Sequence, residues 1–192
     1  MIQSAQSRRM LLAALLWFGL ALGSGAAGLL ERAGPPLPQL ILLGLTAGLV
    51  YAGVSVPGFR AWALRIDLRA VVALHLTRFV GIYFLALFRQ GQLPFAFAVP
   101  GGWGDILVAA LALLLLPVGP PRTRGRRLMY AIWNLIGLVE LLFVVVTAAR
   151  LGLAELESMR ALTRLPLSLL LTFLVPLLLA SHLLIGVRLA RA

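Results

Sequence analysis

The stretch AVVALHLTRFVGIYFLALFR, residues 70–89, decides the fold class of this chain. It is long and apolar enough to cross a bilayer as one helix, yet it carries His75 and Arg78 in its interior. A charged side chain is costly inside a membrane, so an intramembrane arginine usually marks a binding site, an ion path or a buried ion pair. The stretch therefore predicts a membrane helix with a polar site inside it.

The composition extends this conclusion to the whole chain. The 192 residues are 61% hydrophobic and 12% charged, with a mean hydropathy of +1.02. An ordinary soluble domain has about a quarter of its residues charged, so a soluble globular fold is excluded. All 17 basic residues are arginine and the net charge is +11. Because these arginines flank apolar runs, we expect them to contact anionic lipids at the cytoplasmic face and not nucleic acid. The absence of cysteine excludes disulfides and thiolate chemistry.

Apolar runs separated by proline, glycine and arginine predict an all-α membrane bundle of six transmembrane helices in a single domain, 1–192. The predicted spans cover residues of about 10–30, 37–56, 70–88, 103–118, 128–149 and 165–190. Residues 59–69 and 150–164 lie between spans and predict short amphipathic helices at the membrane surface.

The first apolar run has two interpretations. Ser7-Arg8-Arg9-Met10 precedes it in the manner of a twin-arginine export signal, and residues 23–27 (GSGAA) would then be the cleavage region. However, about 21 apolar residues form a full span and exceed a short signal core. We therefore favour a retained membrane helix.

The arginines also predict the orientation of the spans. With the N-terminus inside, the inner segments hold eleven arginines, namely Arg8, Arg9, Arg60, Arg65, Arg69, Arg122, Arg124, Arg126, Arg127, Arg188 and Arg191. The outer segments hold five, namely Arg32, Arg89, Arg150, Arg160 and Arg164. The positive-inside rule then places both termini in the cytoplasm. We expect the protein to lie in the inner (plasma) membrane as a multi-pass protein.

Several spans bring polar side chains to a similar depth. Counted from the inner end of each span, the expected depths are about 8 Å for His75, 12 Å for Arg78, 9 Å for Asn134, 12 Å for His182 and 18 Å for Glu140. Glu140 is the one acid predicted inside the membrane, so it is the expected counter-ion of Arg78. These five residues form the predicted substrate-binding site. They would equally serve as a buried ion pair and interhelical hydrogen bonds that only fix the packing.

His75 and His182 also fit the axial ligands of a haem b, provided that the imidazoles face each other and leave room for the porphyrin. A zinc site is less favoured, because no third ligand shares their layer. Gly102-Trp103-Gly104-Asp105 matches the GxGD motif of intramembrane aspartyl proteases, but that chemistry needs a second carboxylate beside the first. We expect Asp67 and Asp105 at opposite faces, so we interpret Asp105 as part of a helix start near the outer face.

Two further segments bear on the site. Residues 90–102 (QGQLPFAFAVPGG) are too apolar for a solvent loop, and we expect them to lie in the interface or to fold back as a re-entrant segment. Pro176 lacks an N–H and frees the carbonyl of Thr172, which predicts a kink in the sixth helix before His182.

These motifs together resemble a family of uncharacterised bacterial integral-membrane proteins. The similarity begins at Val72 and covers about two-thirds of the chain. It rests on Arg78-x-x-Gly81-x-x-Phe84, Gly91-x-Leu93-Pro94-x-x-Phe97-Ala98, Gly102-x-Gly104-Asp105, Trp133-Asn134-x-x-Gly137-Leu138 and Phe173-Leu174-Val175-Pro176 followed by His182. This chain has Glu140 where the resemblance implies Asp, which keeps the charge. The resemblance supports the spans and the polar residues, and it implies no activity.

We expect a membrane protein that binds or transports a small molecule or ion at its intramembrane polar site. The alternatives are a bis-His haem electron carrier and a non-catalytic subunit of a larger membrane complex; a homo-oligomer also stays open. An enzyme is not favoured, because the sequence contains no nucleophile–base pair and no metal-binding motif.

Overall fold

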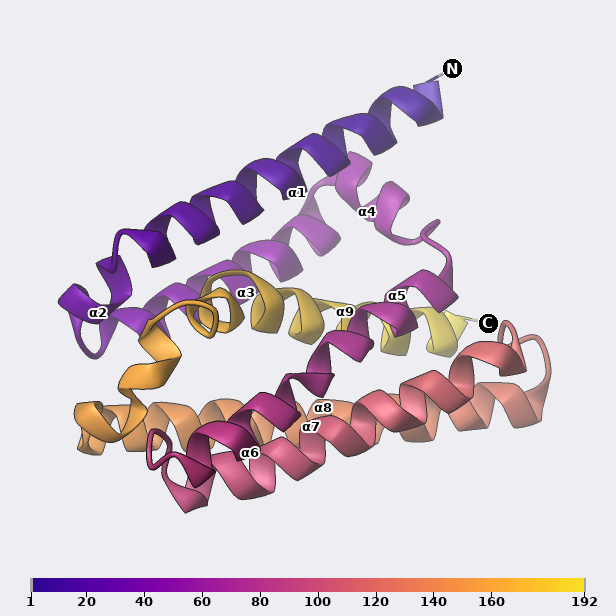
Figure 1. Cartoon of the computed structure of the whole chain (residues 1–192). Helices are drawn as coiled ribbons and strands as arrows, with labels where there is room; N and C mark the ends of the chain where they lie inside the picture. Colours follow the sequence, from indigo (N-terminus) through magenta and orange to yellow (C-terminus); the bar gives the residue numbers. More distant parts are fainter. Residues whose placement is uncertain (1, 192) are drawn as a thin grey trace. The chain divides into compact units, whose positions relative to one another are not determined.

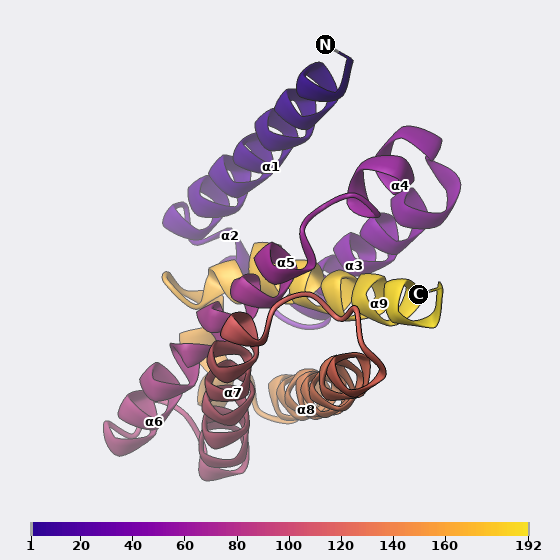
Figure 2. The same ribbon diagram turned by 90° about the vertical axis from the view of Figure 1, so that its right-hand side faces the viewer.

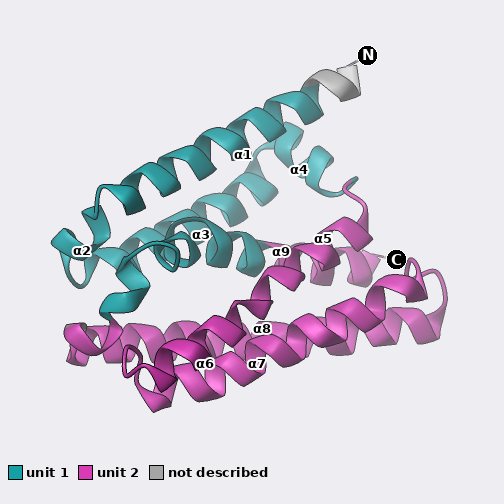
Figure 3. Cartoon of the chain, viewed as in Figure 1, with its two compact units in different colours: residues 1–65, 160–180 teal, residues 66–159, 181–192 magenta. Residues whose placement is uncertain are grey.

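The computed structural model describes residues 2–191, and no strand occurs in that range. The chain is 86% helical. Six helical segments are long and apolar enough to cross a membrane: Gln6–Ala26, Leu37–Ser55, Leu68–Arg89, Phe95–Val118, Arg124–Ala154 and Leu170–Arg191. The all-α organisation predicted from the sequence is therefore correct. The chain forms two compact units, which we call unit 1 (residues 1–65 and 160–180) and unit 2 (residues 66–159 and 181–192) (Figure 3).

Unit 1 is made of two long helices and short connecting ones (Figure 1). Its elements are α1 (Ile2–Ala26), α2 (Leu29–Ala33), α3 (Leu37–Ser55) and α4 (Pro57–Ala63). Gly28 and Gly34 have φ values of 63° and 62°, so glycine allows the chain to turn sharply on both sides of α2. Prolines at positions 35 and 36 then end the turn, and α3 begins at Leu37. A short helix was predicted over 59–69. The helix found there, α4, ends earlier, at Ala63.

The start of the sixth span, also in unit 1, contains a π-helical turn, η4 (Leu170–Leu174). Pro176 follows within two residues, and a π turn is a common way to accommodate a break in the helical hydrogen-bond ladder. The predicted kink before His182 stays a prediction, and the structure has a π turn at this place. The carbonyl of Thr172 accepts a hydrogen bond of 2.8 Å from the indole Nε1 of Trp17. Phe173 packs against the rings of Trp17 and Phe18, with centroids 4.8 and 5.2 Å away.

The third span, which opens unit 2, is a helix interrupted in its middle. It consists of α5 (Leu68–Leu74), the 3₁₀ helix η1 (His75–Val80) and α6 (Gly81–Arg89). The side chain of Asp67 caps α5 by accepting a 2.9 Å hydrogen bond from the Arg69 N–H. Residues three apart lie directly above one another in a 3₁₀ helix. The interruption therefore places His75 and Arg78 on one face of the span.

The fourth span corrects two predictions. It begins at Phe95 and not at Trp103, because α7 runs from Phe95 to Leu115 and continues as the 3₁₀ turn η2 (Leu116–Val118). A tight turn at Gly91, where φ is 71°, leads into it. Residues 95–102 are thus neither a surface segment nor a re-entrant loop but the first two turns of the helix. Asp105 consequently lies ten residues, or about 15 Å, inside α7, and its predicted place near a helix start is wrong.

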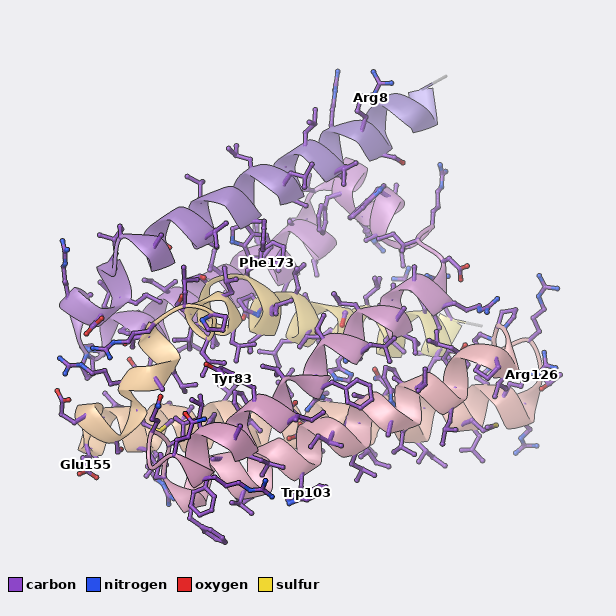
Figure 4. All side chains as sticks on the ribbon, in the orientation of Figure 1. Arg8, Tyr83, Trp103, Arg126, Glu155 and Phe173 are labelled. Atoms are coloured by element: carbon purple, nitrogen blue, oxygen red, sulfur yellow. The ribbon has the colours of Figure 1, made fainter. Side chains whose placement is uncertain are left out.

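The remaining elements of unit 2 are α8 (Arg124–Ala154), η3 (Leu156–Thr163), whose first residues belong to this unit, and the C-terminal part of α9 (Val175–Arg191). Thr123 caps α8 by accepting a 3.3 Å hydrogen bond from the Arg126 N–H. Arg126 and Glu155 mark the two ends of α8 (Figure 4). The helix predicted over 150–164 is instead the last turn of α8 followed by 3₁₀ helix.

Within unit 2, α7 is the central element. It packs against η1 and α6 on one side and α8 on the other (Figure 2). A buried apolar core joins the α5 end of the unit to α7, α8 and α9, and it contains Leu68, Val71, Val72, Val108, Ala112, Leu115, Tyr130, Trp133 and Ile185.

Candidate functional site

The guanidinium of Arg78 is the centre of the site. Arg78 is only 1% exposed, and each of its three nitrogens faces an acceptor from another helix. Nε donates to Asp105 Oδ1 on α7 at 2.6 Å, and Nη1 donates to the carbonyl of Gly137 on α8 at 3.0 Å. Nη2 forms an ion pair with Glu140 Oε2, also on α8. The site therefore contains the predicted Arg78–Glu140 pair, together with a second acid that the sequence analysis had placed elsewhere.

The two carboxylates contact neighbouring nitrogens of the guanidinium. Nε and Nη2 are the pair of nitrogens that normally binds both oxygens of one carboxylate in a fork. Here Asp105 supplies one oxygen and Glu140 supplies the other. The planar, rigid guanidinium therefore contacts oxygen atoms of two different acids through neighbouring nitrogens. The prediction that Glu140 is the one acid inside the spans is wrong, because Asp105 is 4% exposed and contacts the same guanidinium.

The two histidines form a second polar group in the same unit. Their ring centroids are 4.3 Å apart, and both residues are fully buried. His75 Nε2 hydrogen-bonds to Ser181 Oγ at 2.9 Å. The ring of Trp133 stands edge-on to His75, with centroids 4.9 Å apart. His75 Nδ1 and His182 Nε2 have no hydrogen-bond partner among the described residues.

Asn134 determines which ring nitrogen of His182 carries the hydrogen in the neutral ring. Its Nδ2 donates to the backbone carbonyl of His182 at 3.2 Å, so its Oδ1 is the atom that faces His182 Nδ1 at 2.9 Å. An amide oxygen only accepts, and Nδ1 must therefore carry the hydrogen. In the neutral ring the free lone pair is then on Nε2, the nitrogen without a partner.

Four glycines let the helices approach closely enough to build the site. A Cβ added to Gly104 would lie 2.5 Å from Glu140 Oε1, and one added to Gly137 would lie 2.7 Å from His182 Cε1. A Cβ on Gly81 would collide with the carbonyl oxygen of Gly102 and approach Asp105 Cβ to 3.0 Å. Glycine is thus required where the backbone or a functional side chain of one helix occupies the space beside another.

This packing also explains the GxGD sequence. Gly102 lies against α6, Gly104 makes room for Glu140, and Asp105 reaches Arg78. Trp103 between the two glycines is 61% exposed and points away from the helices (Figure 4). An aspartyl-protease dyad needs two carboxylates that are free to activate a water between them, whereas these two are both bound to one arginine. The arrangement therefore fits an ionic cluster and not a protease site.

The histidines do not fit a bis-His haem. Two axial nitrogens at about 2 Å from the iron would hold the ring centroids about 6 Å apart, whereas the centroids of His75 and His182 are 4.3 Å apart. The rings are in direct contact, and His182 also lies against the backbone of Gly137. No porphyrin can lie between them in this structure. No group of three or more His, Cys, Asp or Glu side chains in the described chain could hold a metal ion.

The structure thus places all five predicted residues in unit 2, in two adjoining groups. Arg78 and Glu140 belong to the ionic group, while His75, Asn134 and His182 belong to the imidazole group. Gly137 joins the two groups, because its carbonyl binds Arg78 and the ring of His182 lies against its backbone. Asn134 and Glu140 face different partners, as their separation of about 120° around α8 requires.

Three contributors to the site had been missed: Asp105, Ser181 and the carbonyl of Gly137. A signal for Asp105 does exist in the sequence. The buried face of α7 is lined at helical spacing by small or apolar residues, and Asp105 lies on the same face. The small or apolar residues are Phe97, Ala98, Gly101, Gly102, Val108, Ala109 and Ala112. That stripe starts before Trp103, and it shows that the helix begins earlier and carries Asp105 towards the core.

The fold and the site define a class of protein: an all-helical chain with six segments able to cross a membrane and a buried arginine–carboxylate cluster between three of them. The chain belongs to the family described as Domain of unknown function (DUF8737), which matches residues 35–190 and so includes the whole site. This agrees with the predicted resemblance to a family without an assigned activity. Neither a curated protein nor a solved structure matches the chain.

Proposed function

We propose that this chain is a multi-pass protein of the inner membrane, with both termini in the cytoplasm, that binds and transports a small ion or molecule. Its site is formed by His75, Arg78, Asn134, Glu140 and His182, extended by Asp105. The observation that carries the proposal is the almost completely buried guanidinium of Arg78, which contacts acids from two other spans.

The charged groups of the cluster are costly to bury. Each ionised group loses its hydration on burial, and the attraction between partners only about offsets that loss. An apolar set of side chains of similar size would fold at least as well. Three ionisable groups at the middle of membrane spans are therefore better explained by a role in ion or solute handling than by a role in stability.

The helix interruptions support the same proposal. The third span changes to 3₁₀ helix over the residues that carry His75 and Arg78, and the sixth span has a π turn eight residues before His182. Discontinuous helices at mid-membrane sites are typical of secondary transporters, because broken ladders supply polar groups and points of flexibility.

The charge and the burial of side chains indicate which ligand and which lipids suit this chain. Each nitrogen of Arg78 already faces an acceptor of the chain itself, and two of these acceptors are acids, so a small cation that interacts with the acids fits the site better than an anion that must displace one of them. The large exposed apolar side chains of the spans, such as Leu16, Val54 and Leu114, suit a lipid environment. We propose anionic lipids as contacts of the arginine-rich segments. A homo-oligomer or a larger membrane complex is compatible with this role.

Charge movement across proteoliposomes tests the proposed transport. Solid-supported membrane recordings would apply concentration jumps of H⁺, Na⁺, K⁺, chloride, acetate and phosphate to the wild-type chain. We expect a transient current with at least one of these ions, its loss in Glu140→Gln, and its retention in Glu155→Gln, which makes the same change at the exposed end of the same helix. Absence of current in the wild type with all six ions, or equal currents in both variants, would contradict the proposal.

A further inference from the structure

The ionic group of unit 2 contains one negative charge too many. Arg78 contributes one positive charge, while Asp105 and Glu140 contribute one negative charge each when ionised. The other four acids of the chain are Glu31, Asp67, Glu155 and Glu157. Each of these is exposed or half-buried and lies outside this cluster. A net charge at this depth is strongly disfavoured, so one further positive charge belongs to the site.

We infer that the site binds one exchangeable proton, held between the carboxyl groups of Asp105 and Glu140 beside the guanidinium of Arg78. This inference rests on the site of the proposed function and identifies its ligand. The bound form has one carboxylic acid, one carboxylate and one guanidinium, and is neutral. Release of the proton to water or to a neighbouring acceptor leaves two carboxylates facing one cation.

The geometry favours the two acids as the place of the proton. Asp105 Oδ1 and Glu140 Oε2 contact adjacent nitrogens of one guanidinium. Two ionised carboxylates held side by side in this way repel each other, and sharing one proton removes the repulsion, as in other carboxyl pairs. Each acid also keeps its contact with Arg78, so no donor loses its acceptor when the proton binds.

The other groups that face the cluster are less suitable. His75 lies one 3₁₀ turn from Arg78 on the same face, and His182 lies against the glycine whose carbonyl binds Arg78. A cationic imidazole at either position would therefore lie close to the guanidinium and to the other ring, which is unfavourable. A hard metal cation prefers about six or more oxygen ligands and would compete with Arg78 for the same two acids. A proton requires neither additional ligands nor additional space.

Infrared spectroscopy of the full chain in lipid vesicles tests this inference directly. Carboxyl groups that are accessible to water are ionised at neutral pH, so a carbonyl stretch of a protonated carboxylic acid is expected from the Asp105–Glu140 pair. We expect the wild type to show one such band that shifts in D₂O and disappears as the pH is raised. Glu140→Gln and Asp105→Asn should each remove it, because the remaining acid then ionises against Arg78.

The control and the contrary results are defined by the same measurement. Glu155→Gln removes an exposed acid and should leave the band unchanged, and circular dichroism checks that all variants keep their helical content. Absence of the band in the folded wild type at neutral and mildly acidic pH would overturn the inference. Persistence of the band in both Glu140→Gln and Asp105→Asn would also overturn the inference. So would loss of the wild-type band on addition of NaCl at constant pH, since sodium would then be the compensating cation.

This result is separable from that of the transport recordings. A titrating band without current would leave the proton site in place and remove the proposed transport. A current without the band would leave the proposed transport in place and remove the proton site.

Discussion

The glycines of the two units lie in very different surroundings. In α3 of unit 1, an added Cβ at Gly44, Gly48 or Gly53 would meet no atom within 4 Å. The same holds for Gly19 and Gly23 in α1, whereas Gly25 near the end of α1 lies against Ser168 and Leu165. In unit 2, an added Cβ at Gly81, Gly102, Gly104 or Gly137 would meet a neighbouring helix or a functional side chain at close range. Glycine in unit 2 thus serves to bring helices and charges together.

The two units also differ in how far their spans are buried and in where the buried ionisable residues lie. In the most apolar window of each span, 11% of the residues are buried in α1 and in α3, compared with 39% in the third and fourth spans. The buried ionisable residues Arg78, Asp105, His75 and His182 all belong to unit 2. The comparison indicates that unit 2 is built around a polar site, while the two long helices of unit 1 are exposed apolar spans. Substitutions in the two units should therefore have different effects.

The largest effect is expected from Arg78→Gln. It leaves the buried Asp105 and the partly buried Glu140 without a cation, and breaking a buried ion pair in this way costs about 3–5 kcal/mol. The loss should be smaller at acidic pH, where both acids can take up a proton. Unfolding in mixed detergent micelles at two pH values measures it. Arg164→Gln, which removes an exposed partner of Glu31 in unit 1, is the control and should change stability little. Equal effects of the two substitutions would contradict the difference between the units.

A smaller but still clear effect is expected from Gly81→Ala. The new methyl group would collide with the backbone of Gly102 and press on Asp105, and overpacking of this kind costs about 1–3 kcal/mol. Gly48→Ala in α3 meets open space and removes a flexible residue from a helix, so it should be neutral or stabilising by up to about 1 kcal/mol. Thermal unfolding of the two purified variants compares them. A destabilising Gly48→Ala would show that α3 is more closely packed than described.

The smallest effect concerns pH dependence in unit 1. A hydrogen bond from Arg164, 2.5 Å long, holds the pKa of Glu31 below its ordinary value. A lowered pKa means that this carboxylate stabilises the fold above the pKa of the unfolded chain and loses its contribution as the pH falls through the folded value. Glu31→Gln should therefore lose less stability than the wild type between neutral pH and about pH 3. Identical acid profiles for the two proteins would contradict the contribution of this ion pair.

The sequence predicted the helical class and most of the polar residues for good physical reasons. Long apolar runs bounded by arginine locate spans because of the bilayer's thickness, and a charged residue inside such a run must find a partner. The pairing of Arg78 with Glu140 could therefore be expected from the rarity of acids in the spans.

The errors also have physical causes. Residues 95–102 contain Pro100 and two glycines, which argue against a helix in water but are tolerated in a membrane helix when neighbouring groups satisfy the backbone. The late start assigned to the fourth span then displaced Asp105 from the site. The 3₁₀ segment at His75–Val80 and the sharing of Arg78 by two acids depend on contacts between separate helices, and such contacts cannot be read from the local pattern of one chain.

The central claim is that one buried arginine is shared by two acids, only one of which is ionised. A double-mutant cycle of Asp105→Asn and Glu140→Gln, measured as the free energy of unfolding in mixed micelles at neutral pH, tests it most directly. Each single substitution replaces an acid by a neutral amide and leaves Arg78 one carboxylate, so each should cost no more than about 1 kcal/mol. The double substitution leaves Arg78 without a counter-charge and should cost about 3–5 kcal/mol, far more than the sum. Two large and additive single effects would contradict the claim.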